Sequence, residues 1–340
     1  MRAFAIESPG KMEAVELGPP VVGPEDVLLR IKVIGYCGSD LATYRGLSPL
    51  VTYPRVPGHE IGAVIESCGA LVPAQWQPGM VVTCSPYTSC GKCTACKKGR
   101  FNACQFNQTF GMQREGALTE FVAVPWQKLF VAPGLTAAEH ALVEPLAVGF
   151  HAVDRAGVQA GETVVVLGSG MIGLGAIASA GIMRDARVIA VDVDDRKLAL
   201  AAKAGAAETI NSSKVDLHER LQELTDGQGP DVVIEAVGLA QTFVAAVTEV
   251  CYAGRVVYIG YAKSAVSYET KFFILKELDI RGSRNSTPKD FEDILRMFGT
   301  GRYPIAETIT RTVAMDEAGR AMAEWNADPG SFVKIHVQVD

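Results

Sequence analysis

The chain has 340 residues, of which 48% are hydrophobic and 21% are charged, and its formal net charge is −6. A single hydrophobic core stops growing at roughly 250–300 residues, so we expect two domains. A nucleic-acid or anionic membrane surface would need a basic stripe, and the sequence has no block of lysine and arginine. The composition therefore favours an ordinary globular protein with no nucleic-acid or membrane partner.

Short β-type runs separated by Gly and Pro fill about the first 130 residues. The runs are VLLRIKVIGY, EIGAVIESCG, GMVVTCSPY and LTEFVAVP. This pattern predicts a small β-rich domain of barrel or sandwich type. The N-terminal residues include acidic side chains and no apolar signal core, which indicates a cytoplasmic protein.

Four cysteines then follow within fifteen residues, spaced as Cys90-x2-Cys93-x2-Cys96-x7-Cys104. Four thiolates can complete a tetrahedral shell around Zn²⁺ and leave no open position, so we predict a structural zinc site. In a long chain without a signal peptide, such a cluster favours a metal over disulfides. Unligated thiols or a redox pair are the alternatives. Exposed thiols are a redox liability, and a redox motif needs only two cysteines.

From about residue 146, apolar strands alternate with helices, as in VVVLGSGMIG, RVIAVDV, DVVIEAVG and GRVVYIG. Strands that are apolar on both faces predict a doubly wound parallel sheet. The stretch from Thr163 to Met183 has no charged residue, and its length alone would suit a membrane span. Five glycines within it favour a buried strand, a turn and a helix instead.

The glycines of that turn, Gly168, Gly170 and Gly173, have the spacing G-x-G-x-x-G of a dinucleotide site. The motif follows an apolar strand and opens an apolar helix, and Asp192 ends the next strand. The helix N-terminus would bind the pyrophosphate, and Asp192 would accept hydrogen bonds from the ribose. Asp192 would also repel a 2′-phosphate, so the sequence predicts NAD rather than NADP. Basic residues just after it weaken this prediction.

A second candidate metal site comprises Cys37 in GYCGSD, His59 and Glu60 in VPGHE, and Glu144 in LVEPL. One thiolate, one imidazole and one or two carboxylates suit a catalytic zinc that keeps a position for water or substrate. Each residue alone has a structural explanation, such as a buried cysteine or a glutamate at a helix start. Spacing cannot show that the four meet in space.

Together, GYCGSD, YPRVPGHE, the four-cysteine segment, EPLAVGFHA, GSGMIG and VDVDDRKL resemble the zinc-containing medium-chain dehydrogenases along essentially the whole chain. The resemblance implies an α/β protein with a GroES-like β-rich catalytic domain at 1–146, including a structural zinc lobe at about 84–106. A Rossmann NAD-binding domain with a doubly wound parallel sheet would occupy 147–286. Residues 287–340 would return to the catalytic domain, and the active site would lie in the cleft between the domains.

The resemblance also implies roles for single residues. Cys37, His59 and Glu60 would hold the catalytic zinc, and Glu144 would bind it directly or through its water. The NAD groove would be lined, besides the glycines and Asp192, by Met171, Ile172, Lys197, Val237 and Ile259.

Four more residues are placed at the substrate by the same resemblance. Ser39 would receive the proton of the substrate hydroxyl, and Asp40 would orient the zinc-bound imidazole. Tyr44 and Arg284 would face the substrate. The family commonly has a histidine at the position of Ala42, so the proton relay must end differently here. Ala63 also replaces a family glycine, from which we draw no functional conclusion.

Glutamate rather than cysteine at position 144 resembles the polyol-dehydrogenase branch of the family, and YPRVPGHE and GSRNSTPKDF resemble its L-galactonate and L-gulonate 5-dehydrogenase-like members. We therefore predict a homo-oligomeric (dimeric or tetrameric) enzyme with two zinc ions per chain. It would transfer hydride between NAD(H) and a secondary alcohol of a polyol, sugar or sugar acid. The alternatives are an L-threonine 3-dehydrogenase-like enzyme and a catalytically silent NAD-binding regulatory relative. A zinc-ribbon nucleic-acid binder is disfavoured by the acidic charge.

Overall fold

The computed structural model describes residues 1–339 and divides into two compact units. The first comprises Met1–Glu144 and the C-terminal residues from Thr308, and the second is Pro145–Glu307. The predicted fold class is confirmed, because the first unit is rich in antiparallel strands and the second contains a parallel sheet covered by helices. Residues 287–307, which we predicted to return with the C-terminal segment, are grouped with the second unit.

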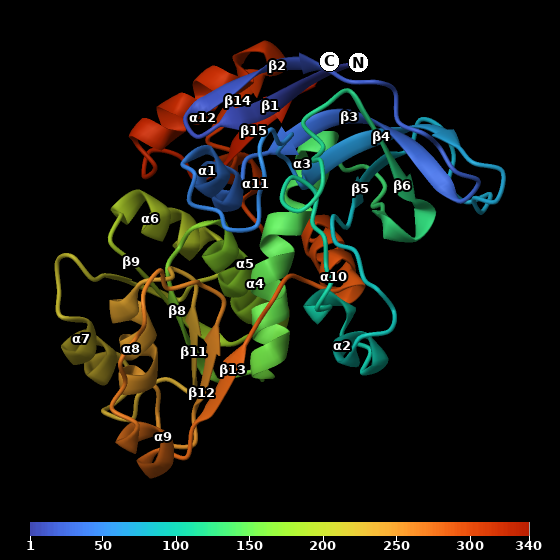
Figure 1. The fold of residues 1–340 in the computed structure, drawn as a ribbon. Helices are drawn as coiled ribbons and strands as arrows, with labels where there is room; N and C mark the ends of the chain where they lie inside the picture. Colours follow the sequence, from blue (N-terminus) through green and yellow to red (C-terminus); the bar gives the residue numbers. More distant parts are fainter. Residues whose placement is uncertain (340) are drawn as a thin grey trace. The chain divides into compact units, whose positions relative to one another are not determined.

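A seven-stranded sheet, ordered β14-β15-β3-β4-β5-β7 with β6 paired to β3, forms the centre of the first unit (Figure 1). A separate hairpin joins β1 and β2. The strands are β1 Arg2–Ser8, β2 Lys11–Glu16, β3 Asp26–Gly35, β4 Glu60–Cys68, β5 Val81–Cys84, β6 Phe121–Pro125, β7 Leu129–Phe130, β14 Arg311–Ala314 and β15 Ile335–Gln338. The helices are α1 Gly38–Tyr44, α2 Thr94–Lys97, α3 Ala137–Ala141 and α12 Ala318–Ala327, with short 3₁₀ turns at Phe101–Ala103, Trp126–Lys128 and Met315–Glu317.

Strand β3 has three pairing partners in this sheet and buries alternate side chains in the core of the unit. Val27, Leu29 and Ile31 have no exposed surface, whereas Arg30 between them faces solvent. Period-two alternation of this kind marks a strand with one face on a core. Replacing Leu29 with Ala would remove buried contacts worth about 2–5 kcal/mol.

The second unit has a six-stranded sheet ordered β10-β9-β8-β11-β12-β13, and each neighbouring pair is parallel. Its strands are β8 Thr163–Leu167, β9 Arg187–Asp192, β10 Glu208–Asn211, β11 Val232–Glu235, β12 Arg255–Tyr258 and β13 Asp279–Gly282. Its helices are α4 Val143–Ala156, α5 Met171–Arg184, α6 Asp195–Lys203, α7 Leu217–Leu224, α8 Ala240–Glu249, α9 Lys271–Leu275, α10 Pro288–Gly299 and α11 Ile305–Thr308. The strands lie between α8 on one side and α4 on the other (Figure 1).

Strands β8 and β11 form the middle of this parallel sheet, and their side chains are nearly all buried. This explains why TVVVL and VVIE read as continuous apolar runs rather than as alternating patterns. The uncharged stretch from Thr163 to Met183 is strand β8, the glycine turn and most of α5, as predicted. No helix within residues 1–339 is long and apolar enough to cross a membrane.

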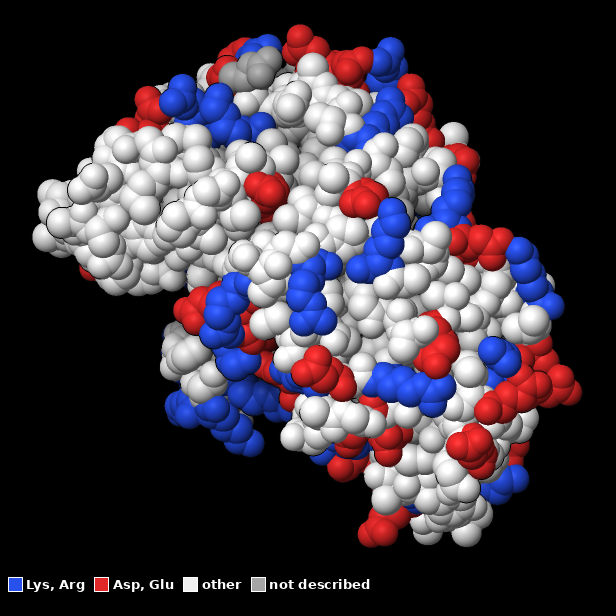
Figure 2. Space-filling model, turned by 180° about the vertical axis from the view of Figure 1, so that it is seen from behind, with Lys and Arg blue, Asp and Glu red and all other residues white. Residues whose placement is uncertain are grey.

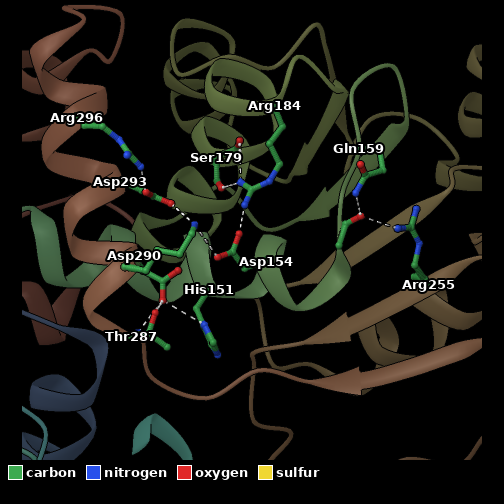
Figure 3. Close-up of polar contacts among 12 residues, drawn as sticks. His151, Asp154, Gln159, Ser179, Arg184, Arg255, Thr287, Asp290, Asp293 and Arg296 are labelled. Carbon is green, nitrogen blue, oxygen red and sulfur yellow. Dashed lines mark hydrogen bonds and ion pairs between the residues drawn. The ribbon is translucent and has the colours of Figure 1, made fainter. Parts of the chain in front are cut away.

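Helices α4, α5 and α10 are joined by a network of charged side chains (Figure 3). Arg184 of α5 donates to Asp154 of α4, and Lys289 of α10 lies 3.2 Å from the other oxygen of Asp154. His151 Nδ1 lies 3.2 Å from Asp290 Oδ2, and both residues are buried. These contacts attach α10 to the helices beside the sheet, which fits the grouping of residues 287–307 with the second unit.

Candidate active site

The structure brings Cys37, His59 and Glu60 together in the first unit. Cys37 caps the N-terminus of α1, and His59 and Glu60 stand where β4 begins. One ligand atom from each residue lies within 4.8 Å of the other two. His59 is 5% exposed and Glu60 is 0% exposed, while Cys37 is partly exposed. This is the predicted donor set of a thiolate, an imidazole and a carboxylate.

Glu60 Oε1 is buried in this group without a hydrogen-bond partner; His59 Nδ1 has none either, but it lies on the side of Asp40. Buried polar atoms are nearly always bonded, so an unpaired carboxylate oxygen at a donor cluster fits a site for a metal ion. Zinc suits nitrogen, sulfur and oxygen donors in this combination. Three protein ligands would leave a fourth position open, which is the arrangement of catalytic rather than structural zinc.

Asp40 lies beside the histidine and joins the two segments that carry the donors. Its Oδ2 accepts from the Cys37 backbone N–H at 2.9 Å, and its Oδ1 accepts from that of Gly58 at 3.3 Å. Oδ1 also lies 3.8 Å from His59 Nδ1, which is longer than a hydrogen bond. Burial alone would lower the pKa of His59, but the charges of Asp40 and Cys37 outweigh it and raise this pKa well above its usual value.

A buried lysine that the sequence analysis did not identify holds Glu60. Lys334, one residue before β15, donates from Nζ to Glu60 Oε2 at 2.5 Å and to the Tyr36 carbonyl at 2.9 Å. Lys334 is 2% exposed. Gly35 makes room for this contact, since a Cβ at that position would lie 2.0 Å from Glu60 Oε2. The only signal in the sequence is a lysine inside the apolar run FVKIHVQV.

Glu144 is buried close to this group but is not part of the 4.8 Å cluster. Its Oε1 accepts a short hydrogen bond from the Tyr87 hydroxyl, and Tyr87 is itself buried. Burial raises the pKa of Glu144, while His59 and the Tyr87 hydrogen bond act in the opposite direction. Tyr87 lies in the loop after β5 and was also missed by the sequence analysis.

The other predicted residues of this region lie on α1. Ser39 is partly exposed in the first turn, and its carbonyl accepts from Thr43. The Tyr44 hydroxyl donates to the Gly10 carbonyl at 2.7 Å, and its ring packs in the core of the first unit. Ala42 is partly buried on the same helix and offers no polar group. The substrate roles of Ser39 and Tyr44 stay predictions.

The four cysteines of the lobe converge as their spacing predicts. The ligand atoms of Cys90, Cys93, Cys96 and Cys104 all lie within 4.8 Å of one another, and all four thiols are free of disulfides. The backbone N–H of Cys93 donates to Cys90 Sγ, and that of Cys90 donates to Cys104 Sγ, both at 3.3 Å. Donation from the Cys96 and Gln105 backbone lowers the pKa of Cys93 to about 6, whereas burial and the neighbouring thiols raise that of Cys96 to about 12. The backbone of the lobe therefore favours the thiolate at Cys93, the form in which cysteine binds zinc.

In the second unit, the glycine turn joins β8 to α5. Gly168 has φ +96°, and a Cβ on Gly173 would lie 1.8 Å from the Gly168 carbonyl oxygen, so both positions require glycine. A Cβ on Gly170, by contrast, would meet nothing within 4 Å, which leaves open the approach expected of a pyrophosphate. Met171 and Ile172, partly buried, form the first turn of α5.

Asp192 ends β9 next to this turn. Its Oδ2 accepts from the Ser169 N–H at 2.8 Å, and its Oδ1 accepts from those of Val193 and Asp194 at 2.8 and 3.1 Å. Lys197 is partly buried one turn into α6. The acidic residue is thus fixed at the carboxyl edge of the sheet, where dinucleotides bind in open α/β sheets.

Val237 and Ile259 follow β11 and β12 at the same edge. Val237 is 44% exposed and Ile259 is 8% exposed. The buried Glu235 shapes the turn after β11, because its Oε1 accepts from the Val237 N–H at 2.9 Å and the Gly238 N–H at 2.7 Å. Arg284 is exposed in the loop between β13 and α10. The contacts of these residues with a cofactor or substrate stay predictions.

The fold and both sites define a zinc-dependent dehydrogenase with a nucleotide-binding domain. Comparison with known families agrees: residues 23–134 match the alcohol dehydrogenase GroES-like domain, and residues 172–300 match the zinc-binding dehydrogenase domain. An uncharacterised zinc-type alcohol dehydrogenase-like protein of Haemophilus influenzae is 34% identical over 99% of this chain and 98% of its own. The L-galactonate-5-dehydrogenase of Escherichia coli K12 is 32% identical over 92% of this chain and 95% of its own. The chain therefore belongs to the zinc-type alcohol dehydrogenase family.

Solved structures support the same assignment. An alcohol dehydrogenase from E. coli CFT073 in complex with NADH has a TM-score of 0.92 at 28% identity and covers 100% of this chain and 99% of that one. A zinc-binding dehydrogenase from Sinorhizobium meliloti 1021 bound to NADP has a TM-score of 0.91 at 31% identity, with 99% of both chains covered. The protein is an alcohol or polyol dehydrogenase that uses zinc and a nicotinamide dinucleotide.

Proposed function

We propose that the protein oxidises a secondary hydroxyl of a polyol, sugar or sugar acid, or reduces the matching ketone, with NAD(H) as the hydride carrier. The observation that carries the proposal is the group formed by the partly exposed Cys37 and the buried His59 and Glu60, with the buried Glu144 beside it. A glutamate at position 144 resembles the polyol branch of the family, and the similar L-galactonate-5-dehydrogenase is named for a sugar-acid substrate.

The metal donors and two residues of α1 would have separate roles in this reaction. Zinc, when bound, polarises the hydroxyl and lowers its pKa. Cys37, His59 and Glu60 would hold it, with Glu144 as a direct or water-mediated ligand. Ser39 would accept the substrate proton, and Asp40 would keep the imidazole in its ligating orientation.

Arg284 and Tyr44 complete the proposed substrate contacts. A guanidinium forms paired hydrogen bonds with a carboxylate, so Arg284 would suit the acid group of a sugar acid. Since no histidine stands at position 42, the proton accepted by Ser39 would leave through water or the ribose of the cofactor.

NAD rather than NADP is proposed because of Asp192. Its carboxylate would accept hydrogen bonds from the ribose and repel a 2′-phosphate. Arg196 of α6 is paired with Asp194 at 2.7 Å, and this pairing would compete with the binding of a 2′-phosphate. In Asp192→Asn, we expect the ratio of kcat/KM for NAD over NADP to fall by about 10-fold or more, on the scale of one charge contact. An unchanged ratio would contradict this role.

The deciding experiment measures zinc per chain and NAD reduction for the wild type and for Cys37→Ser. The panel contains sugar acids, polyols, L-threonine, ethanol and benzyl alcohol. We expect two zinc ions in the wild type, one in the variant, and NAD reduction by sugar acids or polyols in the wild type alone. Reaction with ethanol or benzyl alcohol only would refute the substrate class, and reaction with L-threonine only would indicate the amino-acid enzyme. One zinc in both proteins and no activity would indicate a silent relative.

We further propose a cytoplasmic homo-oligomer, a dimer or tetramer. Two surfaces support self-association. One is the edge strand β13 with α9, where the apolar side chains of Ile274, Leu275 and Ile280 are exposed among charged neighbours such as Lys271 and Arg281. The other is the continuous surface, almost without charged side chains, at the upper left of Figure 2. Light scattering at several concentrations would test this, and a monomer throughout would contradict it.

A further inference from the structure

The ion pair between Lys334 and Glu60 is almost completely buried, which packing alone does not explain. Lysine is almost never fully buried unless it is paired, and here Lys334 and Glu60 are 2% and 0% exposed. The pair is also part of the candidate metal group, because Glu60 supplies one of its three donors. One buried carboxylate thus has two cationic partners available: a lysine of the chain and a metal ion.

The two oxygens of Glu60 are used differently. Oε2 accepts the Lys334 ammonium at 2.5 Å, whereas Oε1 is buried without a partner. Lys334 itself is fixed by its second bond, to the Tyr36 carbonyl at 2.9 Å. The missing side chain of Gly35 brings the two charges together, since Gly35 is paired with Glu60 on one side and with His336 on the other.

Of the ionisable groups near Glu60 in the described part of the chain, Lys334 is the one that supplies a positive charge to its carboxylate. His336 lies two residues along the strand, on the same face as Lys334. Burial and the charge of Lys334 lower the pKa of His336 to about 3, so it is neutral at neutral pH. His59 stands next to Glu60 in the chain, but its counter-charge in the metal-free site is chiefly that of Asp40, and it has to be neutral when it binds a metal. Glu144 is a second carboxylate nearby and adds negative charge when ionised.

We propose that Lys334 is the counter-ion of Glu60 when the metal is absent and that it competes with the metal for this carboxylate. Lys334 is a positioning residue: it compensates the buried charge of Glu60 in the empty site and lowers the affinity of the filled site, because its charge repels the cation. The proposal requires a metal at the Cys37 group but does not depend on the substrate. A failure of the substrate panel would leave it standing.

The test compares Lys334→Met with the wild type in thermal unfolding and in zinc binding at the second, Cys37-dependent site. Removing one member of a buried ion pair leaves the other charge uncompensated. We therefore expect the variant to lose much stability without the second zinc and little with it. By linkage, its affinity for that zinc rises about 10-fold or more. A pure packing role would lower stability equally in both forms and leave the zinc affinity unchanged or weaker, which would overturn the proposal.

Two further variants keep the result interpretable. Glu60→Gln/Lys334→Met removes both charges, so we expect it to recover metal-free stability and to bind the second zinc more weakly than the wild type. Lys276→Met is a control for the loss of a hydrogen-bonded lysine outside both zinc sites, because Lys276 Nζ donates to the Thr248 and Val250 carbonyls at 2.6 and 2.7 Å and forms no ion pair within the described residues. The loss of stability in Lys276→Met should be the same with and without the second zinc. If Lys334→Met does not fold even with zinc, folding of the double variant would support the proposal, and its failure to fold would overturn it.

Discussion

The four-cysteine lobe and the Cys37 group are both candidate zinc sites, yet the chain builds them in opposite ways. The lobe takes its donors from fifteen consecutive residues and supports them with its own backbone N–H groups. The Cys37 group takes donors from two separate segments, and one donor, Glu60, is bonded by Lys334, which is 274 residues away in the chain. A local site is fixed by spacing, whereas a dispersed site is fixed by the fold, and substitutions should affect the two differently.

The largest effect should follow Cys96→Ser, which removes a buried donor of the lobe. Structural zinc contributes about 10–16 kcal/mol of binding energy in small zinc-binding peptides, so we expect a loss of several kcal/mol and unfolding of the lobe. Unfolding in urea and zinc content would measure this, with Cys251→Ser as the control outside both sites. If the variant kept both zinc ions and the stability of the wild type, the lobe would not be a structural metal site.

A large but local effect should follow Gly35→Ala. Its Cβ would lie 2.0 Å from Glu60 Oε2, so Glu60 must move away from the donor group. We expect activity to fall about 100-fold, in line with displaced metal-site geometry, with the lobe zinc retained. Two zinc ions per chain and normal activity would show that the group tolerates displacement of Glu60. Gly18→Ala is a control for the loss of a glycine, because a Cβ there meets nothing within 4 Å and the backbone φ is not positive.

A smaller effect is expected from Tyr87→Phe, which removes the hydroxyl bonded to Glu144. This hydrogen bond lowers the pKa of Glu144, so its loss should raise that pKa further. We expect kcat/KM to fall about 10-fold, the scale of one buried hydrogen bond, and its acid limb to move to higher pH. Zinc content should stay at two per chain. A pH profile identical to that of the wild type would show that the Tyr87 hydrogen bond has no effect on the function of Glu144.

The smallest expected effect is on how the stability of the metal-free protein changes with pH. Because the pKa of His59 is raised in the folded chain without metal, its protonation stabilises the fold fully below about pH 6.5, and this contribution is lost as pH rises through the folded-state value. The free energy of unfolding of the metal-free wild type should therefore fall more, from about pH 6 to 9, than that of His59→Gln. Bound zinc requires neutral His59 and should abolish the difference. Parallel pH curves for the two metal-free proteins would contradict this.

These contrasts explain how much could be predicted from the sequence. The lobe and the glycine turn are contiguous motifs whose spacing determines their geometry, and both converge as expected. Strands with regular patterns, such as β3 and β8, were also predicted. The hairpin β1–β2 and the helices α7 and α8 were not, although Leu217, Leu221 and Leu224 of α7 recur at i, i+4 and i+7, the spacing of one helical face.

Lys334 and Tyr87 could not be predicted, for a different reason. Each contacts its carboxylate only through long-range folding, and neither belongs to a motif. Lys289 and Asp290, in the segment 287–307, likewise bind partners on α4 that are more than 130 residues away in the chain. Charged residues within amphipathic helices are usually solvated, so the sequence offered no reason to expect these contacts.

The short distances between the lobe sulfurs make the lobe sensitive to oxidation after zinc is lost. Cys93 and Cys96 Sγ atoms lie 3.5 Å apart, and the low pKa of Cys93 supplies the reactive thiolate. Once zinc leaves, an oxidant can join them and make the loss permanent, whereas the Cys37 group holds one sulfur and can be refilled. After chelation in air, we expect mass spectrometry to show lobe peptides lighter by about 2 Da and zinc to restore only one ion per chain. Restoration of both ions would show that the lobe resists oxidation.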